Sequence, residues 1–414
     1  VVVGGVRRSA LISLSNLNDD QMAHAKSGMW WENEGQRALA NNSVAYKGKP
    51  QMGTFMREWL SLYESKSGER GIFNRKSAQV QAAKNGRRDA EQDFGCNPCS
   101  EIILRPYQFC NLSEVVARAG DTEESLGKKV RLATILGTFQ STLTDFKYLR
   151  KIWKDNTEEE RLLGVSLTGI MDNALLAGKD ANIGMNISGL LEQLKSVAVN
   201  TNASVAAELG IPQSTAITCV KPSGTVSQLV DSASGIHARH NPYYIRTVRG
   251  DNKDPLTQFM IASGIPAEPD VMKPDSTTVF SFPMKSPDLA VTRTEMSAIE
   301  QLELWLAYQR HWCEHKPSVT ISVKEEEWMD VGSWVYEHFD EVSGISFLPF
   351  SEHTYKQAPY QDIDKHDYKE AMKQMPKSID WTKLQDFEKE DTTSGGRELA
   401  CTAGVCEVVD ISAA

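Results

Sequence analysis

The chain has 414 residues, of which 40% are hydrophobic and 8% aromatic, so it is long enough for a large core or for two to three typical domains. No stretch approaches the roughly 18 uninterrupted apolar residues of a membrane span, and no basic segment precedes an apolar one at the start, so we expect no membrane partner and a cytoplasmic location. The net charge of −10 disfavours nucleic acid as a partner, and seven cysteines, an odd number, argue against a secreted disulfide framework and leave metal binding or thiol chemistry as options.

Strands and helices alternate through the first 250 residues. The run Val1 to Val3 is typical of a buried strand, and the alternation of Ala10, Ile12 and Leu14 predicts a second extended segment. Helical spacing begins after Asn182 and is stopped by Gly210 and Pro212, and the β-branched segment 215–220 then predicts a strand. This alternation predicts an α/β fold.

The last third of the chain has fewer clear elements. Residues 251–290 are rich in Pro, Asp and Lys, 296–314 show helical spacing, and 318–323 and 344–350 are strand-like. Beyond Pro376 the sequence becomes polar, which is typical of a mobile tail.

The densest group of reactive residues is GCNPCSEI at 95–102. It places Asn97, Cys99 and Glu101 at alternate positions, so on an extended strand the three side chains would share one face. A thiol between a hydrogen-bond donor and a base suits radical or nucleophilic chemistry. The alternative is that Cys96 and Cys99 form half of a zinc site.

A second motif, TCVKPSGTVSQL at 218–229, predicts a turn between a strand and a helix. Backbone amides at such a turn can bind phosphate, although Pro, Ser and Gly at a helix start are also an ordinary cap. The expected phosphate-binding residues are Pro222, Ser223, Gly224, Thr225, Val226 and Ser227.

A pair of cysteines, Cys401 and Cys406, lies near the C-terminus with a glycine between them. Two thiols on a flexible arm can exchange with a buried disulfide and then with an external reductant, and zinc binding is the alternative. Cys219 and Cys313 belong to no motif, and we expect them in the core.

Together, CNPCSEI, the following QFCNLSEV and the later KPSGT resemble the active-site and phosphate-binding segments of ribonucleotide reductases. The segments 234–249 and 347–360 resemble the adenosylcobalamin-dependent class of that family rather than its di-iron class. Nearly the whole chain is covered, from GGVRRSA to the tail. The base-off cobalamin motif is missing because His366 lacks the following glycine, so the resemblance implies a cofactor bound with its own base on cobalt.

The resemblance implies residue roles. Cys99 would carry the thiyl radical, Glu101 would be the base, Asn97 would hydrogen-bond to the substrate, and Cys110 would be one of the two thiols that reduce the ribonucleotide. Cys401 and Cys406 would be the shuttle to thioredoxin or a similar dithiol protein. It also implies that residues 1–375 are a partial ten-stranded α/β barrel and that 376–414 carry the mobile redox tail.

Family members carry several hundred residues ahead of the part that resembles this chain, including the first barrel strands and the second reducing cysteine. We therefore expect an upstream polypeptide to complete the barrel. Two alternatives stay open, namely a reductase of the di-iron class and a non-catalytic module clasped by zinc through Cys96, Cys99, Cys401 and Cys406.

Overall fold

A computed structural model describes residues 11–28, 30, 34, 37, 40–66, 68–179, 186–224, 226–350 and 356–388. It confirms the predicted α/β class. The strands are β1 Leu11–Ser15, β2 Ala40–Tyr46, β3 Gly71–Asn74, β4 Gly95–Cys96, β5 Ile103–Leu104, β6 Asn111–Val116, β7 Leu163–Thr168, β8 Thr218–Cys219, β9 Tyr243–Asp251, β10 Ala267–Pro269, β11 Thr277–Lys285, β12 Val319–Val323, β13 Ile345–Pro349 and β14 Tyr360–Asp362. The helices are α1 Asp20–Ala23, α3 Met52–Ser65, α4 Arg75–Ala83, α5 Glu123–Gln140, α6 Lys151–Glu160, α7 Ile187–Leu209, α8 Val226–Leu229, α9 Pro255–Ala262, α10 Ala298–His311, α11 Trp328–Glu337 and α12 Lys365–Gln374, with 3-10 turns η2 Ile170–Asp172, η3 Glu325–Glu327 and η4 Trp381–Asp386.

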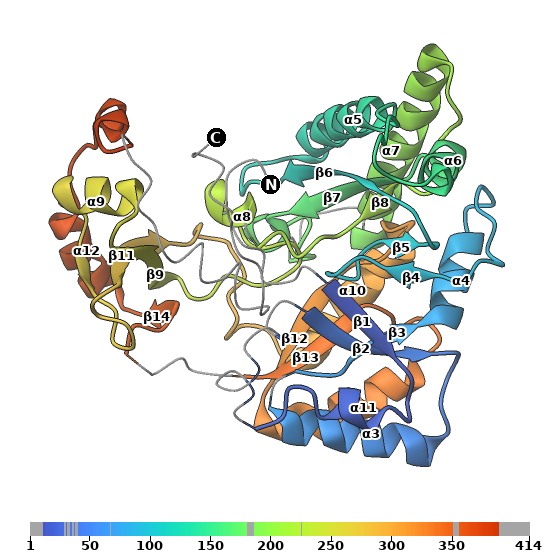
Figure 1. The fold of residues 1–414 in the computed structure, drawn as a ribbon, viewed down its shortest axis with the longest axis horizontal. Helices are drawn as coiled ribbons and strands as arrows, with labels where there is room; N and C mark the ends of the chain where they lie inside the picture. Colours follow the sequence, from blue (N-terminus) through green and yellow to red (C-terminus); the bar gives the residue numbers. More distant parts are fainter. Residues whose placement is uncertain are drawn as a thin grey trace, which may run out of the picture.

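Two sheets form the body of the molecule. One has the strand order β6-β7-β8, all parallel, and the other the order β1-β2-β3-β13-β12, in which β13 is antiparallel to β3. A parallel bridge between Val220 and Pro317 links the end of β8 to the approach to β12. The eight strands therefore form one series whose outer edges, among the described residues, are β6 and β1 (Figure 1).

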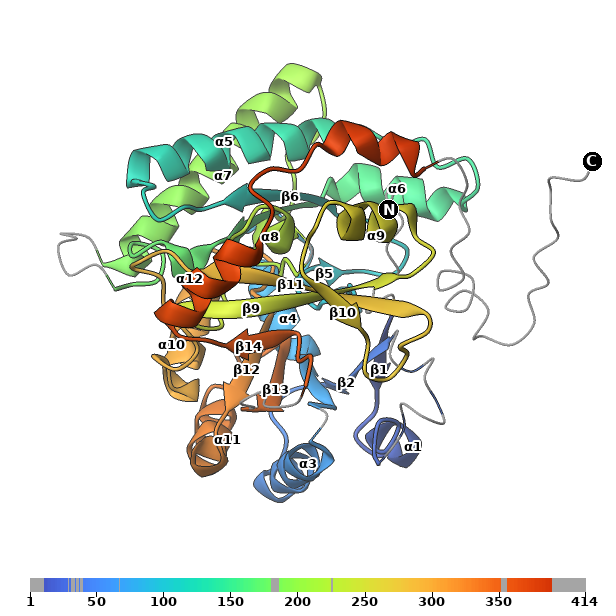
Figure 2. The same cartoon turned by 90° about the vertical axis from the view of Figure 1, so that its left-hand side faces the viewer.

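Helices cover the outer faces of both sheets. Figure 2 shows α5 and α7 beside β6, and α3 and α11 at the opposite end of the body. Side chains from α3, α5, α7, α10 and α11 join the odd-numbered residues of β7 in the main hydrophobic core. Because alternate residues of a strand face opposite ways, the even-numbered residues of β7 face inward, towards the candidate site.

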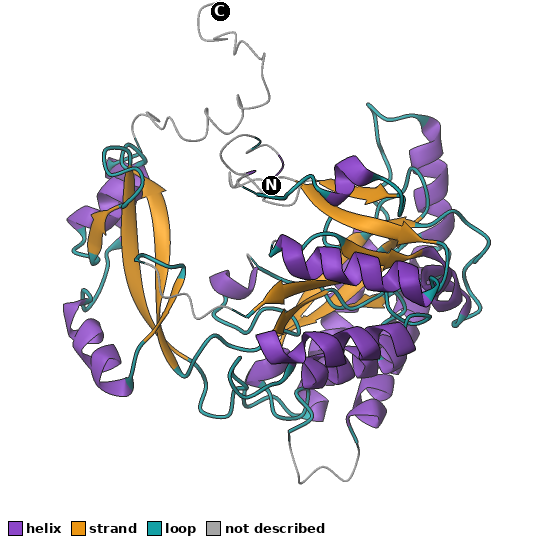
Figure 3. Cartoon of the chain, turned by 90° about the horizontal axis from the view of Figure 1, so that it is seen from below, coloured by secondary structure: helices purple, strands orange, loops and turns teal. Residues whose placement is uncertain are grey.

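A second lobe contains the antiparallel sheet β10-β11-β9-β14. It stands apart from the body and carries α9 and α12 (Figure 3). The sequence pattern predicts no element for 251–290, whereas the structure pairs Thr277–Lys285 with Tyr243–Asp251 along nine residues. Long-range pairing across an intervening helix stabilises this sheet, and a local pattern does not reveal it.

Most of the predicted elements are confirmed. Strand β1 includes Ile12 and Leu14, helix α7 ends where Gly210 adopts φ 66°, and α10, β12 and β13 lie where the periodicity places them. A ten-stranded barrel is not confirmed by the described strands, and the predicted strand Val1 to Val3 lies outside the described residues. Within the described part of the chain, no helix is long and apolar enough to cross a bilayer.

Candidate active site

The segment from Asn97 to Glu101 is a turn, so the predicted extended strand is wrong at this point. Strand β4 ends at Cys96, and the amide of Ser100 donates to the carbonyl of Asn97 at 2.8 Å. Ser100 has φ 68°, a left-handed conformation that breaks strand alternation. The side chain of Asn97 closes the turn, because its Oδ1 accepts from the amide of Ile102 at 3.0 Å.

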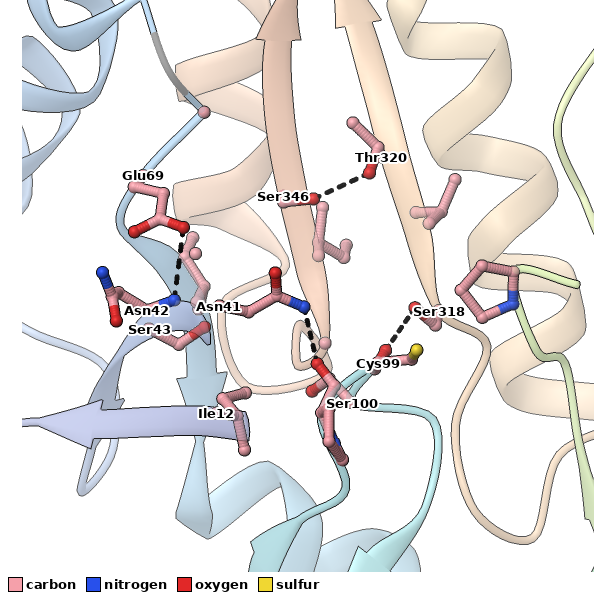
Figure 4. Close-up of a pocket in the computed structure, with 18 of the residues that line it drawn as sticks. Ile12, Asn41, Asn42, Ser43, Glu69, Cys99, Ser100, Ser318, Thr320 and Ser346 are labelled. Atoms are coloured by element: carbon pink, nitrogen blue, oxygen red, sulfur yellow. Dashed lines mark hydrogen bonds between the residues drawn. The ribbon is translucent and has the colours of Figure 1, made fainter. Parts of the chain in front are cut away.

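The turn is held from both sides of the body (Figure 4). Asn41, on β2, donates from Nδ2 to the carbonyl of Pro98 at 2.7 Å. Ser318, just before β12, donates from Oγ to the carbonyl of Cys99 at 2.5 Å. Two backbone carbonyls that flank the Cys99 side chain are therefore fixed by residues far away in the sequence, which sets the direction of the thiol.

Cys99 lines a cavity of about 350 Å³, which we call the Cys99 cavity. Its wall offers many hydroxyl and amide groups, and Pro222 of the predicted phosphate loop also lines it. A second cavity of about 300 Å³, lined by residues such as His237, Arg293 and Tyr360, adjoins the first, because Thr320 and Leu348 line both. The polar residues of the Cys99 cavity are Asn41, Asn42, Ser43, Glu69, Ser100, Ser318, Thr320 and Ser346.

Glu101 is fully buried beside a lysine that sequence analysis did not select. The ammonium of Lys221 lies 3.1 Å from Glu101 Oε1 and 4.0 Å from Cys99 Sγ. Glu101 Oε2 has no hydrogen-bond partner among the described residues. Lys221 directly precedes the predicted phosphate-binding residues. Its position next to a Pro-Ser-Gly turn is the feature of the sequence that could have identified it as a site residue.

Cys110 lies one residue before β6, on the inner side of the body. A Cβ built on Gly164 of β7 would be 3.3 Å from Cys110 Sγ, so the thiol packs against that glycine. Burial raises the pKa of Cys110 well above its ordinary value, and the nearby Glu101 raises it further. The group is therefore a protonated thiol at neutral pH, able to donate hydrogen.

The predicted phosphate loop connects β8 to the short helix α8. Ser223 has φ 53°, and its hydroxyl donates to Glu114 Oε2 at 2.8 Å. The amide of Ser227 donates to the carbonyl of Ser223 at 3.0 Å, and Thr225 lies outside the described residues. The structure thus brings this loop next to β6 and to the turn that carries Cys99.

The remaining cysteines separate into two groups. Cys219 and Cys313 are buried, as predicted. Cys401 and Cys406 lie outside the described residues, so their shuttle role stays a prediction. Among the described residues, the one cluster with metal-ligand spacing is exposed and contains Asp364, His366 and Asp367, with neither Cys96 nor Cys99 in it.

No protein-family model matches the chain. It is similar to the adenosylcobalamin-dependent ribonucleoside-triphosphate reductase of Lacticaseibacillus paracasei, with 28% identity over 89% of the chain and 52% of the relative. Enzymes of the same name from Lactobacillus delbrueckii subsp. bulgaricus and Euglena gracilis are each 27% identical, over 99% and 91% of the chain and 58% and 51% of the relative. The chain therefore spans about half the length of these relatives, and the resemblance predicted from the sequence is confirmed.

Two solved structures are also similar. A B12-dependent class II ribonucleotide reductase matches with a TM-score of 0.72 and 23% identity, over 92% of this chain and 56% of that one. The class Id α subunit of Actinobacillus ureae matches with a TM-score of 0.53 and 12% identity, over 82% and 70%. At these identities the likeness establishes the fold.

Proposed function

We propose that this chain carries the catalytic site of an adenosylcobalamin-dependent ribonucleotide reductase, which converts ribonucleotides to 2'-deoxyribonucleotides. The observation that carries the proposal is the position of Cys99. It lines the Cys99 cavity, and its Sγ also lies 4.0 Å from the ammonium of Lys221, which is paired with Glu101. A thiol in this position can receive a radical from one ligand and act on another.

The residues divide the reaction between them. Cys99, as a thiyl, takes the 3'-hydrogen atom of the substrate, and Glu101 Oε2 accepts the proton of the 3'-hydroxyl. Asn97 uses its Oδ1 to close the turn, so its Nδ2 is the group that would donate to the sugar. Cys110 and a second thiol give up two hydrogens and become a disulfide while the 2'-hydroxyl leaves as water.

The residues around the Cys99 cavity fit a large polar cofactor. The two adjoining cavities provide a continuous lining of hydroxyl, amide and ring groups, and Glu69 Oε2 has no partner among the described residues, so it can accept from an amino or hydroxyl group. Asn41, Ser318, Thr320 and Glu69 would hold the cofactor beside Cys99. Adenosylcobalamin, when bound, supplies the radical chemistry, while the protein supplies its direction.

The second reducing thiol is the reason for expecting an upstream polypeptide. Cys219 lies on β8, two strands from the strand that follows Cys110, and two strand spacings of about 4.8 Å exceed the roughly 7 Å between Cα atoms that a disulfide allows. The other edge of β6 is unpaired among the described strands. Two further strands between β6 and β1 would close a ten-stranded barrel and could bring a cysteine next to Cys110. A barrel closed in this way would also keep water away from the radical site.

The test is hydrogen abstraction in the reconstituted enzyme. The chain would be combined with a polypeptide that carries the missing strands, and then supplied with adenosylcobalamin, 3'-tritiated ribonucleotide and a dithiol. We expect tritium release from the wild type, none from Cys99→Ser, and release close to wild type from Cys96→Ser, the neighbouring thiol at the end of β4.

The outcomes separate the alternatives. Stoichiometric zinc in the purified chain, lost in both cysteine variants, would favour the zinc-clasped module. Tritium release that requires a di-iron partner subunit instead of adenosylcobalamin would favour the di-iron class. Sustained turnover by the chain alone would contradict the need for the upstream polypeptide.

A further inference from the structure

We propose that Lys221 is a further catalytic residue, the cation that pairs with the base Glu101 and stabilises the negative charge that develops on the substrate's 3'-oxygen. This inference rests on the proposed function. Its basis is geometric, because the Lys221 ammonium lies 3.1 Å from Glu101 Oε1 and 4.0 Å from Cys99 Sγ. A single cation thus contacts both the group that abstracts hydrogen and the group that accepts the proton.

The burial of Glu101 shows why a cation is needed. Its side chain is 0% exposed, and within the described part of the chain only Lys221 forms an ion pair with it. When a buried carboxylate loses its cation, burial destabilises its charged form, and the group holds a proton more readily. Removal of Lys221 should therefore favour the protonated form of Glu101, which cannot act as the base.

The unfilled oxygen of Glu101 points to the chemistry of the ligand. Oε1 accepts a hydrogen bond from Lys221, whereas Oε2 is buried and has no partner among the described residues. A buried acceptor in this state is suited to a hydrogen-bond donor that the described residues do not supply. A sugar hydroxyl between Oε2 and the Cys99 thiol would meet that requirement.

The backbone fixes Lys221 in place. Its amide donates to Ser166 Oγ on β7 at 2.8 Å, and the preceding residue, Val220, bridges to Pro317. Pro222 follows directly, and a residue before proline is restricted to extended conformations. The side chain is 18% exposed, so its charge is only partly screened by water.

Other titratable groups surround Glu101, and two of them, Lys316 and Glu114, contact other partners. The ammonium of Lys316 lies 3.3 Å from the hydroxyls of both Ser100 and Ser343 and over the ring of Phe73. Glu114 accepts from Ser223. Besides Lys221, the groups whose electrostatics involve Glu101 are Cys219 on β8, Cys110 directly before β6, Glu114 on β6, Lys316 before β12 and Cys96 at the end of β4.

The step is balanced without another reactant. The bond between C3' and hydrogen breaks homolytically as the S–H bond of Cys99 forms, which leaves a carbon radical. The 3'-hydroxyl proton then moves to Glu101 Oε2, and the electron pair of the O–H bond stays on oxygen. Lys221 keeps its proton throughout and interacts most strongly with the oxygen when it is negative, which lowers the barrier.

The experiment compares Lys221→Met with Lys221→Arg and with Lys128→Met, an exposed control on α5. In the reconstituted enzyme, we expect Lys221→Met to reduce tritium release from 3'-labelled ribonucleotide about 100- to 1000-fold at pH 7, with part of the loss regained as the pH rises. Lys221→Arg should keep the wild-type pH profile. A Lys221→Met variant with unchanged release, or with a uniform loss at every pH, would contradict the proposal.

A second measurement does not depend on turnover. The infrared carboxyl band of Glu101, assigned by its absence in Glu101→Gln, reports whether this side chain carries a proton. At pH 7 we expect the carboxylic-acid band in Lys221→Met and not in Lys221→Arg or Lys128→Met. A Lys221→Met variant without this band would overturn the proposal. If the wild type releases no tritium, the proposed function fails, and the infrared band still decides whether Lys221 acts on Glu101.

Discussion

The hydroxyl of Ser223 donates to Oε2 of Glu114 across a distance of 2.8 Å. This bond joins the predicted phosphate loop to β6, the strand that has a free edge among the described strands. Burial raises the pKa of Glu114 above its ordinary value of 4.5, and the hydrogen bond from Ser223 and the charge of Lys221 offset only part of that effect. The carboxylate is therefore costly to ionise in the folded chain.

The first prediction concerns Glu114→Gln. Because the folded-state pKa is raised, the folded chain binds more protons than the unfolded chain above pH 4.5, so stability falls as the pH rises through the folded-state pKa. The amide cannot ionise and still accepts from Ser223. We expect the variant to be more stable than the wild type at pH 8 and to lose this advantage below pH 4.5, measured by urea unfolding. A stability difference that does not change with pH would contradict this explanation.

The second prediction concerns Gly164→Ala. A Cβ at this position would lie 2.5 Å from Leu112 Cδ2, 3.0 Å from Ile102 Cδ1 and 3.3 Å from Cys110 Sγ. Overpacking of this kind costs about 1–3 kcal/mol. In urea unfolding we expect a loss of that size, together with altered alkylation of Cys110. Gly127→Ala on α5, where nothing lies within 4 Å, should instead stabilise by about 0.5–1 kcal/mol.

The third prediction concerns the buried pair of Arg88 and Glu160. Two bonds of 3.0 and 2.9 Å join them, and their side chains are 0% and 4% exposed. Removing one partner leaves a buried charge unpaired, so Arg88→Met should reduce the free energy of unfolding by about 3–5 kcal/mol. The double variant with Glu160→Met should lose less, and Lys128→Met, which breaks an exposed pair with Glu124, should lose about 0.5 kcal/mol or less. Equal losses in the single and double variants would mean that the pair does not act as a unit.

The fourth prediction tests the shuttle role proposed for Cys401 and Cys406. If these thiols pass electrons to the active site, changing both to Ser spares a single turnover and blocks repeated turnover with thioredoxin. A small dithiol that diffuses into the site should restore activity. The measurement is deoxynucleotide formed per enzyme with each reductant. Repeated turnover with thioredoxin in the double variant would contradict the shuttle role of Cys401 and Cys406.

The sequence by itself predicted the α/β class, which the structure confirms, and it identified GCNPCSEI as the candidate catalytic motif. Periodicity identified α7 and β12, because each has a buried face whose spacing is set within a few consecutive residues. Asn97, Cys99 and Glu101 could be selected from their chemistry alone. The prediction that they share one extended strand is wrong, because Pro98 and the left-handed Ser100 turn the chain after Cys96, and hydrogen bonds from Asn41 and Ser318 hold that turn.

Only the tertiary structure decided which residues meet the Cys99 thiol. Lys221 is 122 positions from Cys99 and Ser318 is 219 positions away, and each is brought there by strand pairing. The edge of β6 that no described strand pairs with, and the separation of Cys110 from Cys219 by strand β7, likewise depend on strand order. A local pattern specifies which face of a strand is buried, whereas the neighbour of each strand follows from the packing of the whole sheet.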